Sequence, residues 1–552
     1  MTWQVTAKNN NHECQFLTPI GIFNFSAKLI CMSDVKKTTK TTYLINTFLA
    51  ILSALTLVVS FPNFELYYLA WFSLIPLLYA LVRTTKTSFA FLLGEIFGIG
   101  YFYGTCYWIT YSMINYGDLH PVVAYFLAFI LVAIVSLFPA LFSAIFNYSV
   151  KRFGFEAILF APLIWVATEF LRLNVAGVGW NALGYSQGFQ PMLIWPARYG
   201  GVSLISALIV LSSSAIVLIL YKRSRLTIAI SSLSLLLCLL VPIVGKLMIK
   251  EIPPPKEAID VVAVQVVAPV GVGQNELVGS LNRQIGMSLM AVKELREENQ
   301  EQQEQIILVA WPESPFSFNY NENENWPRIF GEFTRENKIY LLINAVTPTK
   351  DKTGDYTSVI LIDPNGELVG QYNKIHLLPF GEYVPMRGYL PLIDRIPALA
   401  GDYKSDNKYT TIDLAGVTIG TSICFESVFP DITREMSRAG AQTFINIAND
   451  GWFGQTPISR QHLTHLVMRA VETNRPTLRV TNVGISAYIA ANGQIKDETP
   501  VFEPAVRKWK IDKTAQKQPL TFYSKFGDVF AFACLLTSLL LILAGFRKNR
   551  SK

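Results

Sequence analysis

The sequence predicts a helical membrane domain followed by an α/β domain, and two observations support this division. Hydrophobic residues make up 51% of the 552 residues and charged residues only 16%, which is too apolar for an ordinary soluble protein. Long apolar runs occupy the first half of the chain and its C-terminal end, whereas residues 257–512 alternate short β-rich runs with amphipathic segments.

Eight apolar segments are each long enough to cross the roughly 30 Å hydrocarbon core of a bilayer as a helix. They lie at about 43–61, 65–83, 88–112, 121–149, 155–172, 202–221, 226–249 and 527–546. We therefore expect transmembrane helices one to seven within residues 43–250 and an eighth at 527–546, after the α/β domain.

The basic residues between these segments predict the orientation of the chain. Lysine or arginine precedes the first segment and follows the second, fourth, sixth and eighth, whereas the loops at 62–65 and 115–121 carry neither. By the positive-inside rule, both termini lie in the cytoplasm, including the basic tail 547–552, and residues 257–512 lie on the outer face. The net charge of +7 thus reflects topology and indicates no nucleic-acid partner.

Residues 1–42 form a polar N-terminal extension without the features of a signal peptide. Met32 begins a more usual basic lead-in to the first apolar segment, so we expect translation to start there. The alternative is a cytoplasmic tail that begins at Met1.

Charged residues well inside the apolar segments include Glu95 and the pair Glu169 and Arg172. Charges at membrane depth are costly and often functional. An intrahelical ion pair between Glu169 and Arg172 is an equally good interpretation. Glycines at Gly94 and Gly98 predict close helix packing.

In the α/β domain, strands are predicted at 259–266, 306–310, 339–346, 358–363, 368–372, 417–423, 443–447, 477–481, 485–490 and 506–511. Helices are predicted at 276–300, 328–336 and 459–474, with another that starts near Pro430.

Three residues with useful chemistry each follow a predicted strand: Glu313, Lys374 and Cys424. Residues at the carboxyl ends of strands in an α/β sheet are well placed to converge. A carboxylate that accepts the thiol proton and an ammonium that stabilises an oxyanion would make the cysteine a nucleophile for acyl transfer. Taken singly, each residue also has a simpler interpretation, as a helix cap, a surface lysine and a buried core cysteine.

The sequence around these residues resembles the nitrilase (carbon–nitrogen hydrolase) superfamily, whose members use a Glu-Lys-Cys triad. The matching stretches are Trp311-Pro312-Glu313, Tyr372-Asn373-Lys374, Cys424-Phe425-Glu426 and 449–454. With further matches at 165–187 and 461–487, residues 43–546 as a whole are similar to the bacterial apolipoprotein N-acyltransferase family. This resemblance implies eight transmembrane helices and an extracytoplasmic, nitrilase-like α-β-β-α sandwich.

By this resemblance, Glu313 is the general base, Lys374 the oxyanion stabiliser and Cys424 the nucleophile. Glu382, Phe425 and Glu426 match positions that support the triad. Trp180 and Trp452 match aromatic positions near the entrance for the acyl chain.

The resemblance also implies a ping-pong acyl transfer in the bacterial inner membrane. Cys424 takes an acyl group from a phospholipid, with phosphatidylethanolamine as the expected donor. It passes the group to the α-amine of the diacylglyceryl-cysteine at the N-terminus of an apolipoprotein. A monomeric, multi-pass protein is expected.

No cofactor or metal is expected. His462 and His465 have a spacing that could bind zinc, but no cysteine or carboxylate cluster accompanies them in the sequence. No glycine-rich phosphate loop indicates a nucleotide. Two other functions remain open: a membrane-anchored amidase or nitrilase that releases the acyl group to water, and a non-enzymatic scaffold or transporter.

Overall fold

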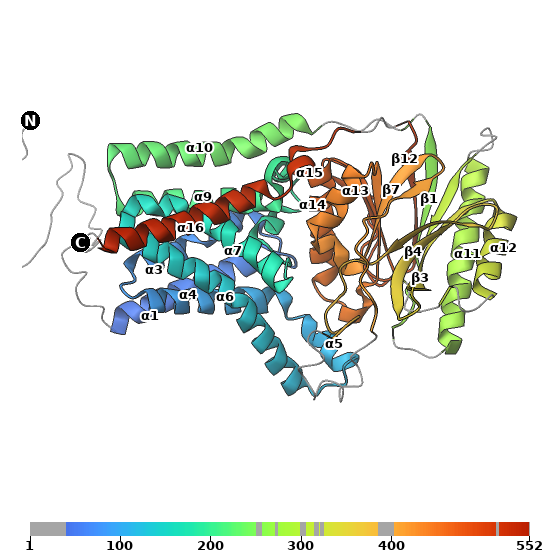
Figure 1. Cartoon of the computed structure of the whole chain (residues 1–552), viewed down its shortest axis with the longest axis horizontal. Coiled ribbons are helices and arrows are strands. Elements are labelled where there is room, and N and C mark those ends of the chain that lie inside the picture. Colours follow the sequence, from blue (N-terminus) through green and yellow to red (C-terminus); the bar gives the residue numbers. More distant parts are fainter. Residues whose placement is uncertain are drawn as a thin grey trace, which may run out of the picture.

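The computed structural model describes residues 40–249, 255, 257–270, 274–298, 305–313, 319–320, 325–384, 402–514 and 518–550. Figure 1 shows a bundle of apolar helices at one end and an α/β domain at the other. The start of α1 and the end of α16 lie at the end of the bundle far from the α/β domain. The predicted extension 1–42 lies outside the described residues up to residue 39.

Seven helices of the described chain are long and apolar enough to cross a membrane. They are α1 (Lys40–Val58), α4 (Thr87–Cys106), α6 (Pro121–Phe153), α7 (Ala161–Ala176) with the preceding turn η3 (Phe155–Phe160), α9 (Ala197–Tyr221), α10 (Arg225–Met248) and α16 (Val529–Arg550). Many of their large apolar side chains are exposed on the bundle surface, as expected where lipid covers a helix.

The predicted segment 65–83 differs from the other seven. It forms the shorter apolar stretch Tyr67–Arg83, made of η2 (Tyr67–Leu69), α2 (Ala70–Ser73) and α3 (Ile75–Arg83). Pro76 lies in the first turn of α3 and supplies no backbone N–H, which favours a helix start at this point. The count of eight spanning helices is therefore not confirmed and stays a prediction.

Close packing between α4 and α6 depends on small residues, as the glycine pattern predicted. A β-carbon at Gly98 would lie 2.7 Å from the β-carbon of Ser136, which is too close for any side chain. Three further short helices join the longer elements: α5 (Ile109–Asn115), η4 (Leu183–Gln187) and α8 (Pro191–Ile194).

The α/β domain contains two six-stranded sheets. The first has the order β12 (Ala505–Asp512), β1 (Ala258–Gln265), β2 (Ile307–Ala310), β3 (Tyr340–Pro348), β4 (Asp355–Ile362) and β5 (Leu368–Asn373). The second has the order β11 (Ile495–Lys496), β10 (Ala487–Ile489), β9 (Thr477–Thr481), β8 (Thr443–Ala448), β7 (Val417–Ile423) and β6 (Ile412–Leu414). The short edge strands β6 and β11 were not predicted.

The two sheets pack face to face, because one apolar core contains buried residues from both, such as Ile259, Leu361, Ile419 and Leu478. Helices α11 (Gln274–Glu298) and α12 (Asn325–Asn337) cover the first sheet on the side away from the bundle. Helices α13 (Pro430–Arg438) and α14 (Ile458–Thr473) lie between the second sheet and the bundle (Figure 1). The domain is thus the α-β-β-α sandwich that the resemblance implied.

The side chain of Gln461 on α14 joins the sandwich to the bundle. Its carbonyl oxygen accepts hydrogen bonds from the indole N–H groups of Trp180 (2.9 Å) and Trp108 (3.1 Å). Its amide donates to the carbonyl oxygens of Pro62 (3.0 Å) and Thr105 (2.9 Å). Because this glutamine is buried and both ends of its amide are bonded, it fixes α14 against three separate segments of the bundle.

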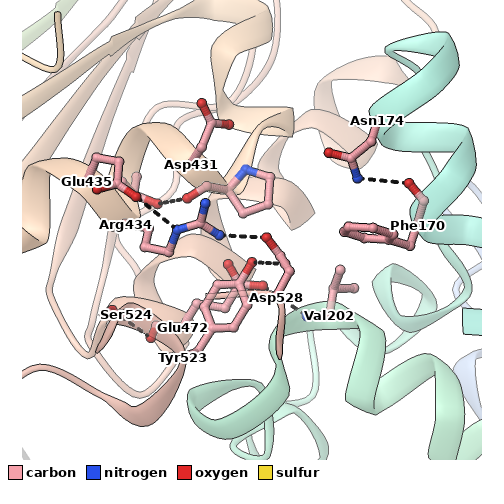
Figure 2. Close-up of polar contacts among 12 residues, drawn as sticks. Phe170, Asn174, Val202, Asp431, Arg434, Glu435, Glu472, Tyr523, Ser524 and Asp528 are labelled. Atoms are coloured by element: carbon pink, nitrogen blue, oxygen red, sulfur yellow. Dashed lines mark hydrogen bonds and ion pairs between the residues drawn. The ribbon is translucent and has the colours of Figure 1, made fainter. Parts of the chain in front are cut away.

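A second polar contact joins the two parts where α14, α9 and α16 meet (Figure 2). Arg434 on α13 pairs with Asp528, just before α16, at 2.7 Å, and the Tyr523 hydroxyl donates to the same carboxylate at 2.8 Å. The Glu472 carboxylate on α14 accepts the backbone N–H of Val202 at 2.9 Å. Val202 resumes α9 after a break at Gly201, so a carboxylate of the sandwich caps a helix of the bundle.

Candidate active site

Cys424 lies at the end of β7, where the chain turns into the 3₁₀ helix η7 (Cys424–Val428). Its backbone has φ +51°, a left-handed conformation that residues other than glycine rarely adopt. Such conformations persist only where the surrounding structure holds them, and they gather at functional sites. The cysteine side chain is buried between the two sheets.

Topology brings Lys374 and Glu313 to the same edge of the first sheet. β2 and β3 are parallel, β4 is antiparallel to β3, and β5 is antiparallel to β4, so β2 and β5 run in the same direction. Glu313 follows β2, and Lys374 follows β5. The carboxyl ends of these two strands therefore open at one side of the sheet, facing the end of β7.

The three residues predicted from the sequence lie together. Lys374 is 1% exposed, and its Nζ lies 3.7 Å from Glu313 Oε1 and 2.6 Å from Glu382 Oε1. The charge of Glu313 raises the pKa of the Cys424 thiol, so these two side chains also lie close together. The backbone N–H of Asn449 donates to Glu313 Oε2 at 3.0 Å and so fixes the carboxylate.

Burial dominates the protonation of this cluster. It raises the pKa of Glu313, and the nearby Lys374 only partly offsets this. Burial, followed by the Glu313 charge, also raises the pKa of the Cys424 thiol, against the opposing effect of Lys374. Burial acts to lower the pKa of Lys374, but Glu382 and Glu313 outweigh it and raise that pKa. The resting cluster thus holds a thiol, a carboxylate suited to take its proton, and an ammonium.

Glu426 fixes the two chain segments that carry the lysine and the cysteine. It accepts hydrogen bonds from the backbone N–H of Ile423 (2.8 Å) and of Ile375 (2.7 Å), and from the Tyr372 hydroxyl (2.7 Å). Because Ile423 precedes the cysteine and Ile375 follows the lysine, this buried carboxylate sets their separation. Glu382 is held in turn by the backbone N–H of Leu378 at 2.7 Å.

Aromatic side chains connect the cysteine to the bundle. Phe425 stacks on Trp180 with ring centroids 6.3 Å apart, and Trp180 contacts Trp108 at 5.2 Å. Trp452 lies further out, 40% exposed and packed against Tyr116. The two tryptophans named from the sequence thus occupy different places, since Trp180 is buried at the junction and Trp452 is at the surface.

The loop that carries Trp180 is held by the two charged residues of α7. Arg172 donates to the carbonyl oxygen of Trp180 at 2.6 Å, and Glu169 accepts the backbone N–H of Leu183 at 2.7 Å. Within the described residues, the structure shows no ion pair between Glu169 and Arg172. Each of the two charged side chains therefore binds the loop and not the other charged residue.

Sequence reasoning missed a buried charged cluster under the cysteine, made by Asp450, His462 and Arg479. The sequence pattern offers His462 as a match to the family and, with His465, as a spacing that could bind zinc, but it assigns His462 no role at the cysteine. In the structure His462 contacts Asp450 and the cysteine backbone, while His465 lies between the rings of Trp180 and Tyr185. Buried charges require partners, so polar residues on a predicted helix and a predicted strand, His462 and Arg479, were the available signal.

Two family models match the chain. Residues 53–215 match the apolipoprotein N-acyltransferase N-terminal domain, and residues 278–519 match carbon-nitrogen hydrolase. The first match covers most of the bundle and the second most of the sandwich.

Similar whole chains occur among curated proteins. An apolipoprotein N-acyltransferase of Geobacter metallireducens is 31% identical over 516 residues, which cover 91% of this chain and 95% of that protein. One of Haemophilus influenzae is 29% identical over 521 residues, covering 91% and 94%. Among solved structures, the nitrilase-superfamily protein Nit3 of Saccharomyces cerevisiae is 18% identical, with a TM-score of 0.35, and covers 48% of this chain and 93% of its own.

Proposed function

The chain belongs to the apolipoprotein N-acyltransferase family, and we propose that it N-acylates lipoproteins by a ping-pong mechanism with Cys424 as nucleophile. The observation that carries this proposal is the buried contact of Cys424, Glu313 and Lys374 in a sandwich bonded directly to an apolar helix bundle. Both substrates are anchored in lipid, so an active site next to the membrane surface lets them reach the sulfur without leaving the bilayer.

In the first half-reaction, Glu313 takes the thiol proton as the sulfur attacks the ester carbonyl carbon of a phospholipid. Lys374 stabilises the oxyanion that forms, and Glu382 keeps the ammonium protonated and in position. The carbon–oxygen bond to glycerol then breaks, the glycerol oxygen takes the proton from Glu313, and a lysophospholipid leaves. The acyl group remains on Cys424 as a thioester.

In the second half-reaction, the α-amine of a diacylglyceryl-cysteine attacks the thioester carbonyl carbon and gives its proton to Glu313. The same lysine stabilises the second oxyanion. The carbon–sulfur bond breaks, the sulfur recovers a proton from Glu313, and an amide is released. We assign phosphatidylethanolamine as the donor, and the protein acts as a monomer.

We further propose that the sandwich faces the periplasm and that the broken stretch Tyr67–Arg83 completes eight crossings of the inner membrane. Both ends of the described chain lie at the end of the bundle away from the sandwich (Figure 1), which requires an even number of crossings. Seven long helices plus this stretch supply eight. The basic residues at both chain ends then lie in the cytoplasm.

Incubation of the purified protein with labelled phosphatidylethanolamine and a diacylglyceryl lipopeptide tests the proposal. We expect N-acylated peptide, and a labelled thioester located at Cys424 by mass spectrometry. Cys424→Ala removes both products, whereas Cys534→Ala, which changes a buried cysteine of α16, retains them. Normal transfer by Cys424→Ala contradicts the proposal, and release of free fatty acid alone supports the amidase alternative.

A further inference from the structure

His462 of α14 binds the backbone of the cysteine rather than its sulfur. Its Nε2 lies 3.0 Å from the carbonyl oxygen of Cys424, and the side chain is 2% exposed. A carbonyl oxygen only accepts hydrogen bonds, so Nε2 carries the proton in this contact. The ring is thus one of the groups that hold Cys424 in its left-handed conformation.

The other ring nitrogen of His462 is fixed by two buried charges. Nδ1 lies 2.9 Å from Asp450 Oδ1 and 3.1 Å from Arg479 Nη2, and Arg479 also binds the Asp450 carboxylate at 2.9 Å. Burial and the Arg479 charge lower the pKa of His462, so the imidazole is neutral with its proton on Nε2. Nδ1 then accepts a hydrogen bond from Arg479 Nη2, which also donates to the Asp450 carboxylate and is held in place by it. Arg479 therefore holds both the tautomer and the direction of the ring.

The carbonyl that His462 binds belongs to the same peptide group as the N–H of Phe425. A peptide unit is planar, and in the trans form its C=O and N–H point in opposite directions. Fixing the carbonyl toward His462 therefore fixes the direction of the Phe425 N–H. That N–H is among the first of helix η7, where backbone donors have no acceptor within the helix.

We propose that His462 is a positioning residue that locks the Cys424–Phe425 peptide so that the Phe425 N–H and the Lys374 ammonium can both bind the oxyanion. The proposal rests on the proposed acyl transfer at Cys424. Asp450 and Arg479 act through the imidazole. The same peptide lock operates in both half-reactions, because each passes through an oxyanion on the carbon attached to the sulfur.

The test compares two reactions of the same sulfur. Thioester formation from phospholipid develops an oxyanion, whereas alkylation by iodoacetamide displaces iodide and develops none. We expect His462→Phe to slow thioester formation roughly 10²- to 10³-fold, the usual effect of losing one oxyanion donor. The alkylation rate of Cys424 stays unchanged, because Glu313 still accepts the thiol proton.

Two further variants sharpen the comparison. His462→Gln places an amide N–H near the former Nε2 and restores part of the thioester rate. His465→Phe is the matched control, since it replaces a fully buried histidine one turn later whose ring nitrogens have no hydrogen-bond partner among the described residues. It leaves the ratio of the two rates as in the unchanged protein. If His462→Phe fails to fold, Asp450→Ala, which removes the carboxylate that fixes Arg479 and so loosens its hold on the imidazole, gives the same selective loss to a smaller degree.

The inference is overturned if alkylation and thioester formation fall together, which indicates general disruption of the site, or if neither falls. Failure of the proposed function has a different signature, because Cys424→Ala would then still transfer acyl groups. If Cys424→Ala abolishes transfer but His462→Phe does not slow thioester formation relative to alkylation, only the positioning role is rejected.

Discussion

The ammonium nitrogen of Lys374 lies 2.6 Å from Glu382 and 3.7 Å from Glu313. The closer carboxylate therefore neutralises the lysine, and the more distant one stays available to accept a proton. This asymmetry agrees with the different roles that the resemblance implies for the two carboxylates, Glu313 as the base and Glu382 as a supporting residue.

Glu382→Gln tests this division. The amide oxygen of glutamine can still accept a hydrogen bond from Lys374, but the negative charge that helps to raise the pKa of Glu313 is gone. We expect the acid limb of the pH–rate profile for thioester formation to move to lower pH, with a reduced maximum rate. Glu367→Gln removes an exposed charge elsewhere in the same domain and leaves the profile in place. An unmoved or upward-shifted limb contradicts the assignment.

Glu313→Gln removes the group that we propose accepts the thiol proton. Burial raises the pKa of Glu313 above its ordinary value of 4.5, so in the unchanged protein activity falls as the pH drops through that raised pKa and the base becomes protonated. The acid limb therefore lies above pH 4.5. In the variant, we expect thioester formation to drop by roughly 10²- to 10⁴-fold and this limb to disappear. Mass spectrometry of the acyl-enzyme over a pH series measures both effects, and a retained limb indicates a different base.

Gln461→Leu weakens the joint between sandwich and bundle. Leucine leaves the Trp180 indole N–H and the Pro62 carbonyl oxygen without this partner, whereas Trp108 and Thr105 still bond each other, and each unsatisfied buried group costs roughly 1–3 kcal/mol. We expect a lower Tm in detergent and earlier proteolytic separation of the two parts. The exposed Gln518→Leu serves as the control. Equal Tm values for the two variants would show that the joint depends on other contacts.

Gly201→Ala tests the break in α9 just before Val202, whose backbone N–H binds Glu472 (Figure 2). Gly201 has φ +63°, and a β-carbon there would lie 2.7 Å from the Tyr523 ring. We expect a loss of roughly 1–3 kcal/mol in the free energy of unfolding. Gly279→Ala makes the same substitution in helix α11, where the added β-carbon would meet no atom within 4 Å. We expect this control to raise the free energy of unfolding by up to about 1 kcal/mol. Thermal unfolding of both variants in detergent measures the difference in sign.

Much of the fold was predictable because hydrophobic patterning is local. Runs such as 417–423 and 443–447 show their strands without help from the rest of the chain, and long apolar runs show helices. The edge strands β6 and β11 were missed, because three and two residues are too few to show a pattern. The stretch 65–83, predicted as one apolar segment, forms η2 continued by α2 and then, after a break at Leu74, α3.

By itself, the sequence determined the two-part architecture and named Glu313, Lys374 and Cys424, because each follows a predicted strand and carries a reactive group. Only the tertiary structure decided which group each polar side chain binds. Glu169 and Arg172 bind a loop instead of each other, and His462 binds the cysteine backbone instead of a metal. The physical reason is that a hydrogen bond depends on the direction and distance between atoms far apart in the chain, which residue type and spacing do not encode.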